Sequence, residues 1–366
     1  MTEFSESTAR PATGARNAPL PGDRRAIARL TIAFLLVFYL VIAVISLNIG
    51  AAQISLSDAL SAFTSPNDTS GARDRIILFD IRLPRLFLGT LIGAALAVSG
   101  AILQSLFRNP LADPGLIGIS AGASFGAVLM IVLGGASLSF ISITLGLFAL
   151  PVMSFLGALI VTFLLYRIST RNGRTSIVTM LLAGIALQAF AFALTGVLIF
   201  LADDQQLRDL TFWSLGSLAG ATWPKIFASG SIIVLSMATL PFLATGLNAM
   251  ALGEATAFHL GIPVQKLKNA AITVTAAATG AAVAVSGGIG FVGIVVPHLL
   301  RLLIGPDNRY LIPASAILGA CLMIFADMIA RTIVAPAEMP IGIITALAGA
   351  PFFIWLLVRK RGILET

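Results

Sequence analysis

Charged residues are scarce in this chain. They make up only 11% of its 366 residues, whereas 58% are hydrophobic; soluble domains carry about 25% charged residues. So few polar side chains could not cover the core of a soluble protein of this length. The composition therefore excludes a soluble enzyme, a disordered protein and a nucleic-acid-binding domain, although the formal net charge is +7.

Cysteine and histidine are almost absent as well. One cysteine, Cys321, excludes a disulfide framework and a cysteine-based zinc site. The two histidines, His259 and His298, lie 39 residues apart and form no ligand motif. His298 follows Pro297 in a hydrophobic stretch, which favours a role in capping freed backbone groups over metal ligation. We expect no stably bound metal or cofactor.

No Gly-x-x-x-x-Gly-Lys-Ser/Thr motif occurs, so ATP-driven transport would need an ATPase on another chain. The run Gly288-Ile-Gly-Phe-Val-Gly293 matches Gly-x-Gly-x-x-Gly, but it lies between hydrophobic stretches without a βαβ pattern. We interpret these glycines as turn and packing residues rather than as a dinucleotide site.

Long hydrophobic stretches dominate the remainder. A membrane helix needs about 20 mainly apolar residues. We predict an all-α polytopic membrane protein with ten transmembrane helices, at residues 27–49, 83–107, 114–134, 142–166, 177–201, 226–247, 270–287, 291–304, 311–334 and 341–358. Arginines precede the first stretch, but its apolar run is longer than that of a signal peptide, so we expect an uncleaved anchor.

The basic residues predict the orientation. With the N-terminus in the cytoplasm, 16 of the 23 Lys and Arg residues face inward and 7 face outward, in agreement with the positive-inside rule. We expect a multi-pass protein of the cytoplasmic (inner) membrane with both termini in the cytoplasm. Residues 1–26 lack periodicity and are predicted to be a disordered tail, followed by one ten-helix permease domain at 27–362.

The outward basic residues depart from the positive-inside rule and need an explanation. Four of them lie between Arg73 and Arg85. Asp74 and Asp80 could neutralise these arginines locally, or the arginines could form a docking surface for an acidic partner or an anionic substrate. Farther along, Asp327 and Arg331 are four residues apart on one predicted helix and can pair.

Two segments resemble each other. Residues 94–102 and 281–289 match at seven of nine positions, and five predicted helices separate them. An odd number of helices inverts the second copy, so the chain is predicted to be an inverted repeat of two five-helix halves, a common transporter architecture. Chance similarity between small-residue membrane segments is the alternative.

Two polar interruptions are candidates for function. Residues 248–263 can form a short amphipathic cytoplasmic helix that fits a partner's groove or lies on lipid. The outer segment 203–223 contains Arg208, Phe212 and Trp213. Its part at 212–223 is too short for a span, and either a re-entrant helix or an interfacial aromatic loop fits its sequence.

These motifs together identify a family. From about residue 27 to 362 the chain resembles the permease subunits of type II ABC importers for iron–siderophore complexes, heme and vitamin B12. The matching segments are 81–85 (IRLPR), 93–100 (GAALAVSG), 108–114 (RNPLADP), 118–123 (GISAGA), 251–254 (ALGE), 260–261 (LG), 290–298 (GFVGIVVPH) with Arg301, 338–342 (EMPIG) and 349–353 (GAPFF).

The resemblance implies a homodimer of ten-span permeases, with two ATP-binding subunits inside and a substrate-binding protein outside. Arg82, Arg85 and Arg331 match positions that receive acidic residues of the binding protein. Residues 248–263 match the ATPase coupling loop, whose candidate contacts are Ala251, Leu252, Gly253, Glu254, Phe258, His259, Leu260 and Gly261. Phe258-His259 departs from the family, where a basic or polar residue often precedes Leu-Gly.

The cargo implied by the resemblance is heme, because residues 113–118 and 206–217 look most like heme permeases. Arg208 could attract propionates, and Phe212 and Trp213 could face the flat macrocycle; alternatively, Arg208 pairs with Asp204 or Asp209. A ferric siderophore is the second candidate and vitamin B12 the third.

We expect alternating access without chemistry on the cargo. A secondary transporter coupled to ions is the alternative from another class, but it would need carboxylates at mid-membrane depth. Asp327 is the one candidate, and it lies toward an outer end. A membrane enzyme would need clustered polar groups within the spans, and the sequence shows none.

Overall fold

The computed structural model describes residues 24–50 and 72–364 of the chain. The predicted tail, residues 1–26, lies almost entirely outside them. The described part is helical apart from one short hairpin, and α1 begins at Arg25. The elements are α1 (Arg25–Asn48), α3 (Ala72–Ile76), the π-helix η2 (Ile77–Arg82), α4 (Leu83–Phe107), the 3-10 helix η3 (Pro114–Ile117), α5 (Ile119–Leu133), α6 (Ser139–Leu145), the 3-10 helix η4 (Gly146–Phe148), α7 (Ala149–Ser169), β1 (Thr170–Arg171), β2 (Arg174–Thr175), α8 (Ile177–Leu201), α9 (Asp204–Ser214), α10 (Trp223–Ala238), α11 (Leu240–Ala251), α12 (Glu254–His259), α13 (Val264–Ser286), α14 (Val292–Ile304), α15 (Asn308–Ala330) and α16 (Ile341–Leu364).

This is an all-helical polytopic membrane protein, as predicted. Within the described residues, six helices are long and apolar enough to cross a membrane, and the pair α10 and α11 makes a seventh span if counted as one. Three apolar helices are shorter, namely α5, α14 and the apolar part of α16. Each of the ten predicted stretches overlaps one of these helices or the α10–α11 pair.

Local sequence explains where the helices depart from the prediction. The stretch predicted at 226–247 bends by 52° between α10 and α11, because Pro241 in the first turn of α11 lacks the amide that a continuous helix requires. The stretch predicted from 270 begins earlier, at Val264. Its first turns contain Lys268, whose whole side chain is buried although its charge lowers the hydropathy.

Helix α4 lies at the centre of the bundle, and most of its residues are buried. Glycines permit this close packing. A Cβ on Gly93 would lie 2.3 Å from the carbonyl oxygen of Gly319 in α15, and a Cβ on Gly100 would lie 1.9 Å from that of Gly293 in α14. Gly93 and Gly100 of α4 therefore let three helices meet at backbone distance.

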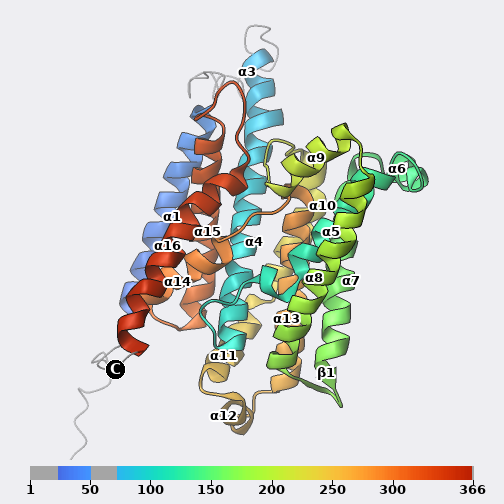
Figure 1. Ribbon diagram of the computed structural model, residues 1–366. Coiled ribbons are helices and arrows are strands. Elements are labelled where there is room, and N and C mark those ends of the chain that lie inside the picture. The colour runs from blue at the N-terminus through green and yellow to red at the C-terminus, as the bar shows by residue number, and fades with distance from the viewer. Residues whose placement is uncertain (1–23, 51–71, 365–366) are drawn as a thin grey trace, which may run out of the picture.

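The bundle has two ends of different character (Figure 1). One end carries α12, the β1–β2 hairpin and the last turn of α16, and it is called the α12 end below. The opposite end carries α3 and α9 and is called the α3 end. Asn172 and Gly173 join the two strands with positive φ angles of 51° and 70°, as a two-residue hairpin turn requires.

Candidate functional site

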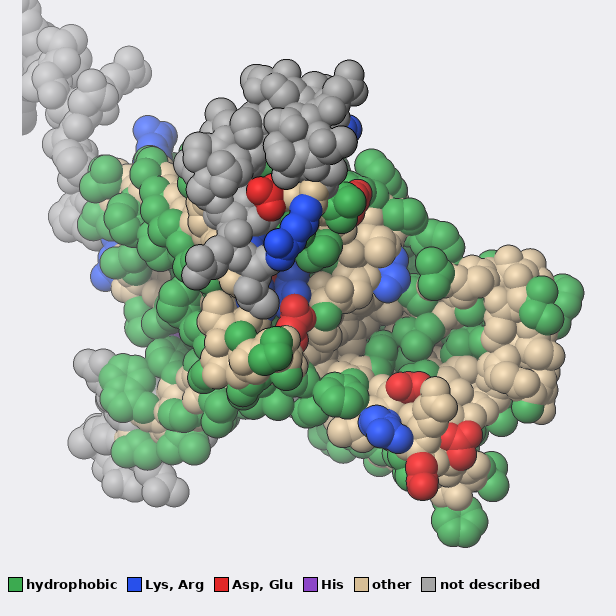
Figure 2. All heavy atoms as spheres, turned by 90° about the horizontal axis from the view of Figure 1, so that it is seen from above, with side chains coloured by type: hydrophobic (Ala, Val, Ile, Leu, Met, Phe, Trp, Pro, Cys, Tyr) green, Lys and Arg blue, Asp and Glu red, His purple; other side chains and the backbone are tan. Residues whose placement is uncertain are grey.

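Three arginines gather at the α3 end. Arg82 ends η2, Arg85 lies in the first turn of α4, and Arg331 follows α15. Their exposed fractions are only 4%, 6% and 6%. Figure 2, which views this end, shows basic and acidic side chains close together there. Buried guanidinium groups need partners, so the contacts of each arginine decide what the cluster can do.

Arg85 is held by two carboxylates. Its Nε lies 2.8 and 3.0 Å from the two carboxylate oxygens of Asp327, and its Nη1 lies 2.8 and 2.9 Å from those of Glu338. Asp327 is buried with it, whereas the Glu338 side chain is 40% exposed. Because these bonds are charge-assisted, they fix α4 to the end of α15 and to the loop before α16.

Arg331 and Arg82 tie the cluster to α1. Arg331 lies 3.5 Å from Asp327, which confirms the predicted pair four residues apart, and its Nη2 donates to the carbonyl and hydroxyl oxygens of Ser46 at 2.9 and 3.0 Å. Arg82 donates to the Leu47 carbonyl oxygen. Both arginines thereby satisfy carbonyl groups in the last turn of α1, where cations also complement the helix dipole.

These contacts correct the picture of an open basic surface. Local neutralisation by Asp74 and Asp80 was one of two alternatives, but Arg85 takes its carboxylates from positions 242 and 253 residues away. The arginines are a buried network rather than exposed docking groups. A partner's acidic residues can reach Arg85 only by displacing one of its carboxylates, so the docking role stays a prediction.

The α12 end presents apolar side chains on a short helix. Gly253, with φ of +109°, precedes α12, and Gly261, with φ of +80°, follows its C-terminal cap. Leu252, Phe258 and Leu260 are 66%, 69% and 61% exposed. Ala251, Glu254 and His259 are exposed as well, and Gly253 is half-buried. Figure 1 shows α12 projecting from the bundle, so this loop offers apolar knobs suited to a partner's groove.

A buried lysine fixes α12 to the hairpin. Lys268 lies 2.7 Å from a carboxylate oxygen of Glu254 in α12 and donates to the carbonyl oxygen of Thr175 in β2 at 2.9 Å. Gln265 accepts from the Thr175 amide at 3.0 Å and donates to its hydroxyl at 2.6 Å. A cavity of about 850 Å³ lies between hairpin and α12, lined by Phe258 among others.

The sequence reasoning missed Lys268, Gln265 and the hairpin. Gln265, Lys266 and Asn269 surround Lys268 at the start of α13, so its charge alone gave no signal that the residue is buried. Its carboxylate partner Glu254 lies in the predicted coupling loop, but the Thr175 carbonyl group lies 93 residues away and could not be foreseen.

Helix α9 forms the rest of the α3 end. Asp203 and Gln206 cap its N-terminus with reciprocal side-chain to backbone hydrogen bonds, which form a capping box. Gln206 also donates to the Val132 carbonyl oxygen of α5 at 3.2 Å. Leu210 packs into an apolar cluster with residues of α5 and α8. These contacts hold α9 against the bundle and decide which of its residues face outward.

The candidate cargo residues do not share one face. Arg208 and Phe212, one turn apart on α9, are both exposed, whereas Trp213 packs against the largest apolar core cluster. Among the ion pairs of residues 24–50 and 72–364, none joins Arg208 to Asp204 or Asp209. Arg208 and Phe212 therefore remain together as candidates, and Trp213 is a packing residue.

The segment after α9 is not a re-entrant helix. Residues 215–222 are irregular, with Gly216 at φ +73°. Ser217 donates its amide to the Ser286 carbonyl oxygen at 2.7 Å, and Gly342 donates to that of Leu215 at 3.0 Å. This loop thus joins the end of α13 to the start of α16, beside an apolar pocket of about 480 Å³.

Comparisons with known proteins decide the family. The FecCD transport family matches residues 36–359. The chain belongs to the FecCD transport family. It is 44% identical over 333 residues to the hemin transport system permease protein HmuU of Yersinia pestis, covering 91% of this chain and 96% of that protein. It is 41% identical over 303 residues to the vitamin B12 import system permease protein BtuC of Klebsiella pneumoniae, covering 81% and 87%.

A solved structure agrees with this membership. It is described as an inward-facing conformation of a transporter assigned to the metal-chelate ABC type, and it matches 90% of this chain and 99% of its own with a TM-score of 0.78 and 32% identity. The chain is thus a permease of ABC importers. Within the described residues no group of three or more metal-ligating side chains occurs.

Proposed function

We propose that this chain is the heme-translocating permease of an ABC importer. The observation that carries the proposal is the 44% identity to a hemin permease over nearly the full length of both chains. The fold supports a permease, because α12 projects apolar side chains at one end while the arginine network lies at the other. We propose that two copies of the chain assemble with two ATPase subunits at the α12 ends and a binding protein at the α3 ends.

The orientation and span count belong to the same proposal. We propose ten spans with both termini in the cytoplasm, the three shorter apolar helices crossing together with the long ones. The central helix α4 and its counterpart five spans later, α13, are the two long helices with the largest buried share, which supports an inverted repeat. The two similar segments differ in structure: residues 94–102 lie inside α4, whereas α13 ends at Ser286, within the second segment, 281–289.

Alternating access follows from these placements. ATP-driven closure of the partner ATPases moves α12, and Lys268 transmits this movement to α13 through its ion pair with Glu254. The cargo passes without being coordinated, so no ligand of this chain would hold it. Arg208 and Phe212, exposed at the α3 end, are proposed to meet the cargo as it leaves the binding protein.

The transport test uses the permease with its ATPase and binding protein in liposomes. ATP-dependent uptake is measured for heme, a ferric siderophore and vitamin B12. We expect heme to accumulate most. Accumulation without the ATPase would overturn the importer assignment, and preferential uptake of either other cargo would overturn heme while leaving the permease assignment intact.

A second test addresses the docking network. Arg82→Glu and Arg85→Glu reverse the charge of proposed docking residues, and Arg73→Glu is the matched control, since Arg73 is exposed at the same end. We expect the first two variants to bind the binding protein at least tenfold more weakly, with Arg73→Glu unchanged. Assembly with the ATPase at the opposite end reports correct folding. Equal affinities for all four proteins would refute the docking role.

A further inference from the structure

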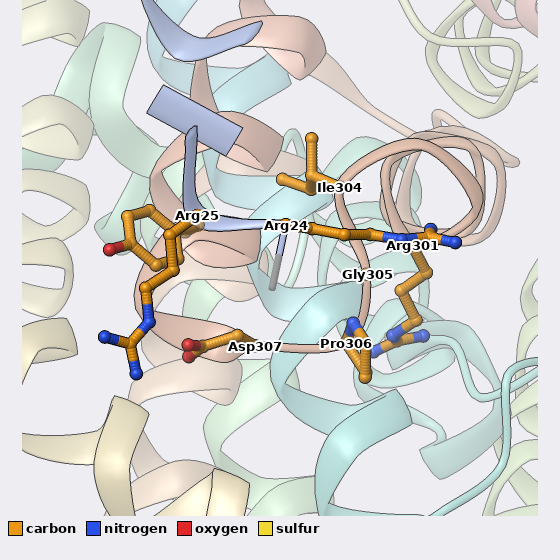
Figure 3. Close-up of a pocket in the computed structure, with 8 residues that line it drawn as sticks. Arg24, Arg25, Arg301, Ile304, Gly305, Pro306 and Asp307 are labelled. Atoms are coloured by element: carbon orange, nitrogen blue, oxygen red, sulfur yellow. The ribbon is translucent and has the colours of Figure 1, made fainter. Parts of the chain in front are cut away.

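A polar pocket lies at the α12 end, away from α12 itself. It has a volume of about 390 Å³ and opens between the start of α1, the end of α14 and the turn before α15 (Figure 3). Its lining includes Arg24, Arg25, Arg301, Gly305, Asp307 and Tyr310. None of these residues takes part in the coupling or docking contacts described above.

The pocket carries excess positive charge. Three arginines line it against one carboxylate, that of Asp307. This carboxylate is already engaged, because Arg309 lies 2.6 Å from its Oδ2 and Asn248 donates to its Oδ1 at 2.7 Å. Asp307 is thus already shared with Arg309, and the guanidinium groups around the cavity outnumber its one carboxylate. An anion is the chemical class of ligand that the pocket favours.

Two of the arginines donate only to uncharged oxygens of the described residues. Arg24 donates to the Leu302 carbonyl oxygen at 3.2 Å. Arg301 donates to Ser105 at 3.2 Å, to the Ala101 carbonyl oxygen at 3.3 Å and to the side chain of Gln104. Figure 3 shows the Arg24 side chain extending past Gly305 toward that of Arg301. A guanidinium group has five N–H donors, so the pair retains donors for a shared anion.

The protein surface beside the pocket is apolar. On α1, Ile27, Leu30 and Phe34 are 49%, 74% and 65% exposed, and on α14, Leu302 and Leu303 are 58% and 55% exposed. In a membrane protein, exposed side chains of this kind contact acyl chains. The pocket therefore lies where an apolar surface gives way to basic residues, at the depth of lipid headgroups.

We propose that this pocket binds the phosphate headgroup of an anionic membrane lipid, with its acyl chains along α1 and α14. Arginine forks match phosphate oxygens in pairs, and basic pockets between membrane helices are a recurrent form of headgroup site. A free phosphate offers the same oxygens but gains nothing from the apolar surface. The lipid would fix the start of α1 to α14 at the membrane surface.

The test compares purified full-length permease with the double variant Arg24→Gln/Arg25→Gln. Arg29→Gln is the matched control, because Arg29 is an exposed arginine one turn farther along α1 that does not line the pocket. Native mass spectrometry measures binding of phosphatidylglycerol and phosphatidylcholine. Thermal unfolding measures protection by phosphatidylglycerol, by inorganic phosphate and by glycerol 3-phosphate.

We expect phosphatidylglycerol to bind the wild type and the control alike and the double variant roughly tenfold to thirtyfold more weakly, since each basic residue near a surface contributes about 1 kcal/mol. Phosphatidylcholine should discriminate little among the three proteins. Equal binding of phosphatidylglycerol by all three would overturn the site. Equal protection by glycerol 3-phosphate or inorganic phosphate would overturn the lipid as its ligand.

Discussion

The contact between Lys268 and Glu254 permits a quantitative test of how α12 is attached to the membrane helices. The Lys268 side chain is 5% exposed and that of Glu254 is 44% exposed. The two partners therefore differ in what their loss leaves behind. Glu254→Gln leaves a buried ammonium group without its carboxylate, whereas Lys268→Met leaves a carboxylate that water can reach.

The expected losses of stability follow from this asymmetry. Breaking a buried pair so that one charge is stranded costs about 3–5 kcal/mol. Here the stranded Lys268 keeps its bond to the Thr175 carbonyl oxygen, and the lost carboxylate was partly hydrated, so we expect about 2–3 kcal/mol for Glu254→Gln. Lys268→Met loses one ion pair and one hydrogen bond and leaves a methionine that fills the space, for about 1–2 kcal/mol.

The double variant separates the ion pair from the two side chains. Once Lys268 is methionine, replacing Glu254 by glutamine strands no charge, so the double variant should resemble Lys268→Met at about 1–2 kcal/mol. The sum of the single losses is about 3–5 kcal/mol, which leaves an interaction of about 2–3 kcal/mol between the two positions.

Unfolding of the purified permease in detergent measures these losses. Stimulation of ATP hydrolysis in the assembled complex then reports whether a loosened α12 still couples the ATPase subunits to the membrane helices. If Lys268→Met is as destabilising as Glu254→Gln, or if the double variant equals the sum of the singles, the inference that a buried ion pair attaches α12 to α13 is refuted.

Three further predictions are tested separately. Gly100→Val should destabilise the fold by several kcal/mol or prevent folding, since its Cβ would meet the Gly293 carbonyl group, whereas Gly135→Ala, with nothing within 4 Å, should be neutral in unfolding assays. Phe258→Ala should leave stability unchanged and weaken ATPase assembly in pull-down titrations by about tenfold, because this exposed ring is a proposed interface anchor. Hydrogen bonding from the Arg309 side chain is the main cause that lowers the pKa of Asp307 to about 2. The ionised Asp307 therefore contributes its full stability above about pH 4 and loses that contribution as the pH falls toward 2. Asp307→Asn should flatten the dependence of unfolding free energy on pH in that window.

Most of the fold was predictable because the hydrophobic stretches are long and uninterrupted. The predicted stretches 83–107 and 177–201 coincide with α4 and α8. Where prediction departs from structure, a local residue is responsible. Pro241 breaks a stretch whose mean hydropathy alone shows one continuous span, and the buried, ion-paired Lys268 hides the start of α13 from a hydropathy count.

The sites were predictable only in part, for a different reason. Exposure of Leu252 and Phe258 follows from a short amphipathic pattern, which the sequence displays directly. The partners of Arg85 are 242 and 253 residues distant, and no periodicity in a single sequence encodes such pairs. Sequence reasoning found the unusual charges, but only the fold shows which of them neutralise each other.

That neutralisation constrains how the proposed docking at the α3 end could work. Asp327 supplies a carboxylate to both Arg85 and Arg331 and is 3% exposed, so its displacement would leave the buried Arg331 without a carboxylate and Arg85 with Glu338 alone. Glu338 contacts only one of them, through a side chain that is 40% exposed, and it lies in the loop that leads into α16. A carboxylate from a docking protein would therefore replace Glu338 rather than Asp327. Such an exchange conserves the number of ion pairs and frees the start of α16. Because α16 reaches the opposite end of the bundle, docking at the α3 end would then change the position of a helix that extends to the α12 end.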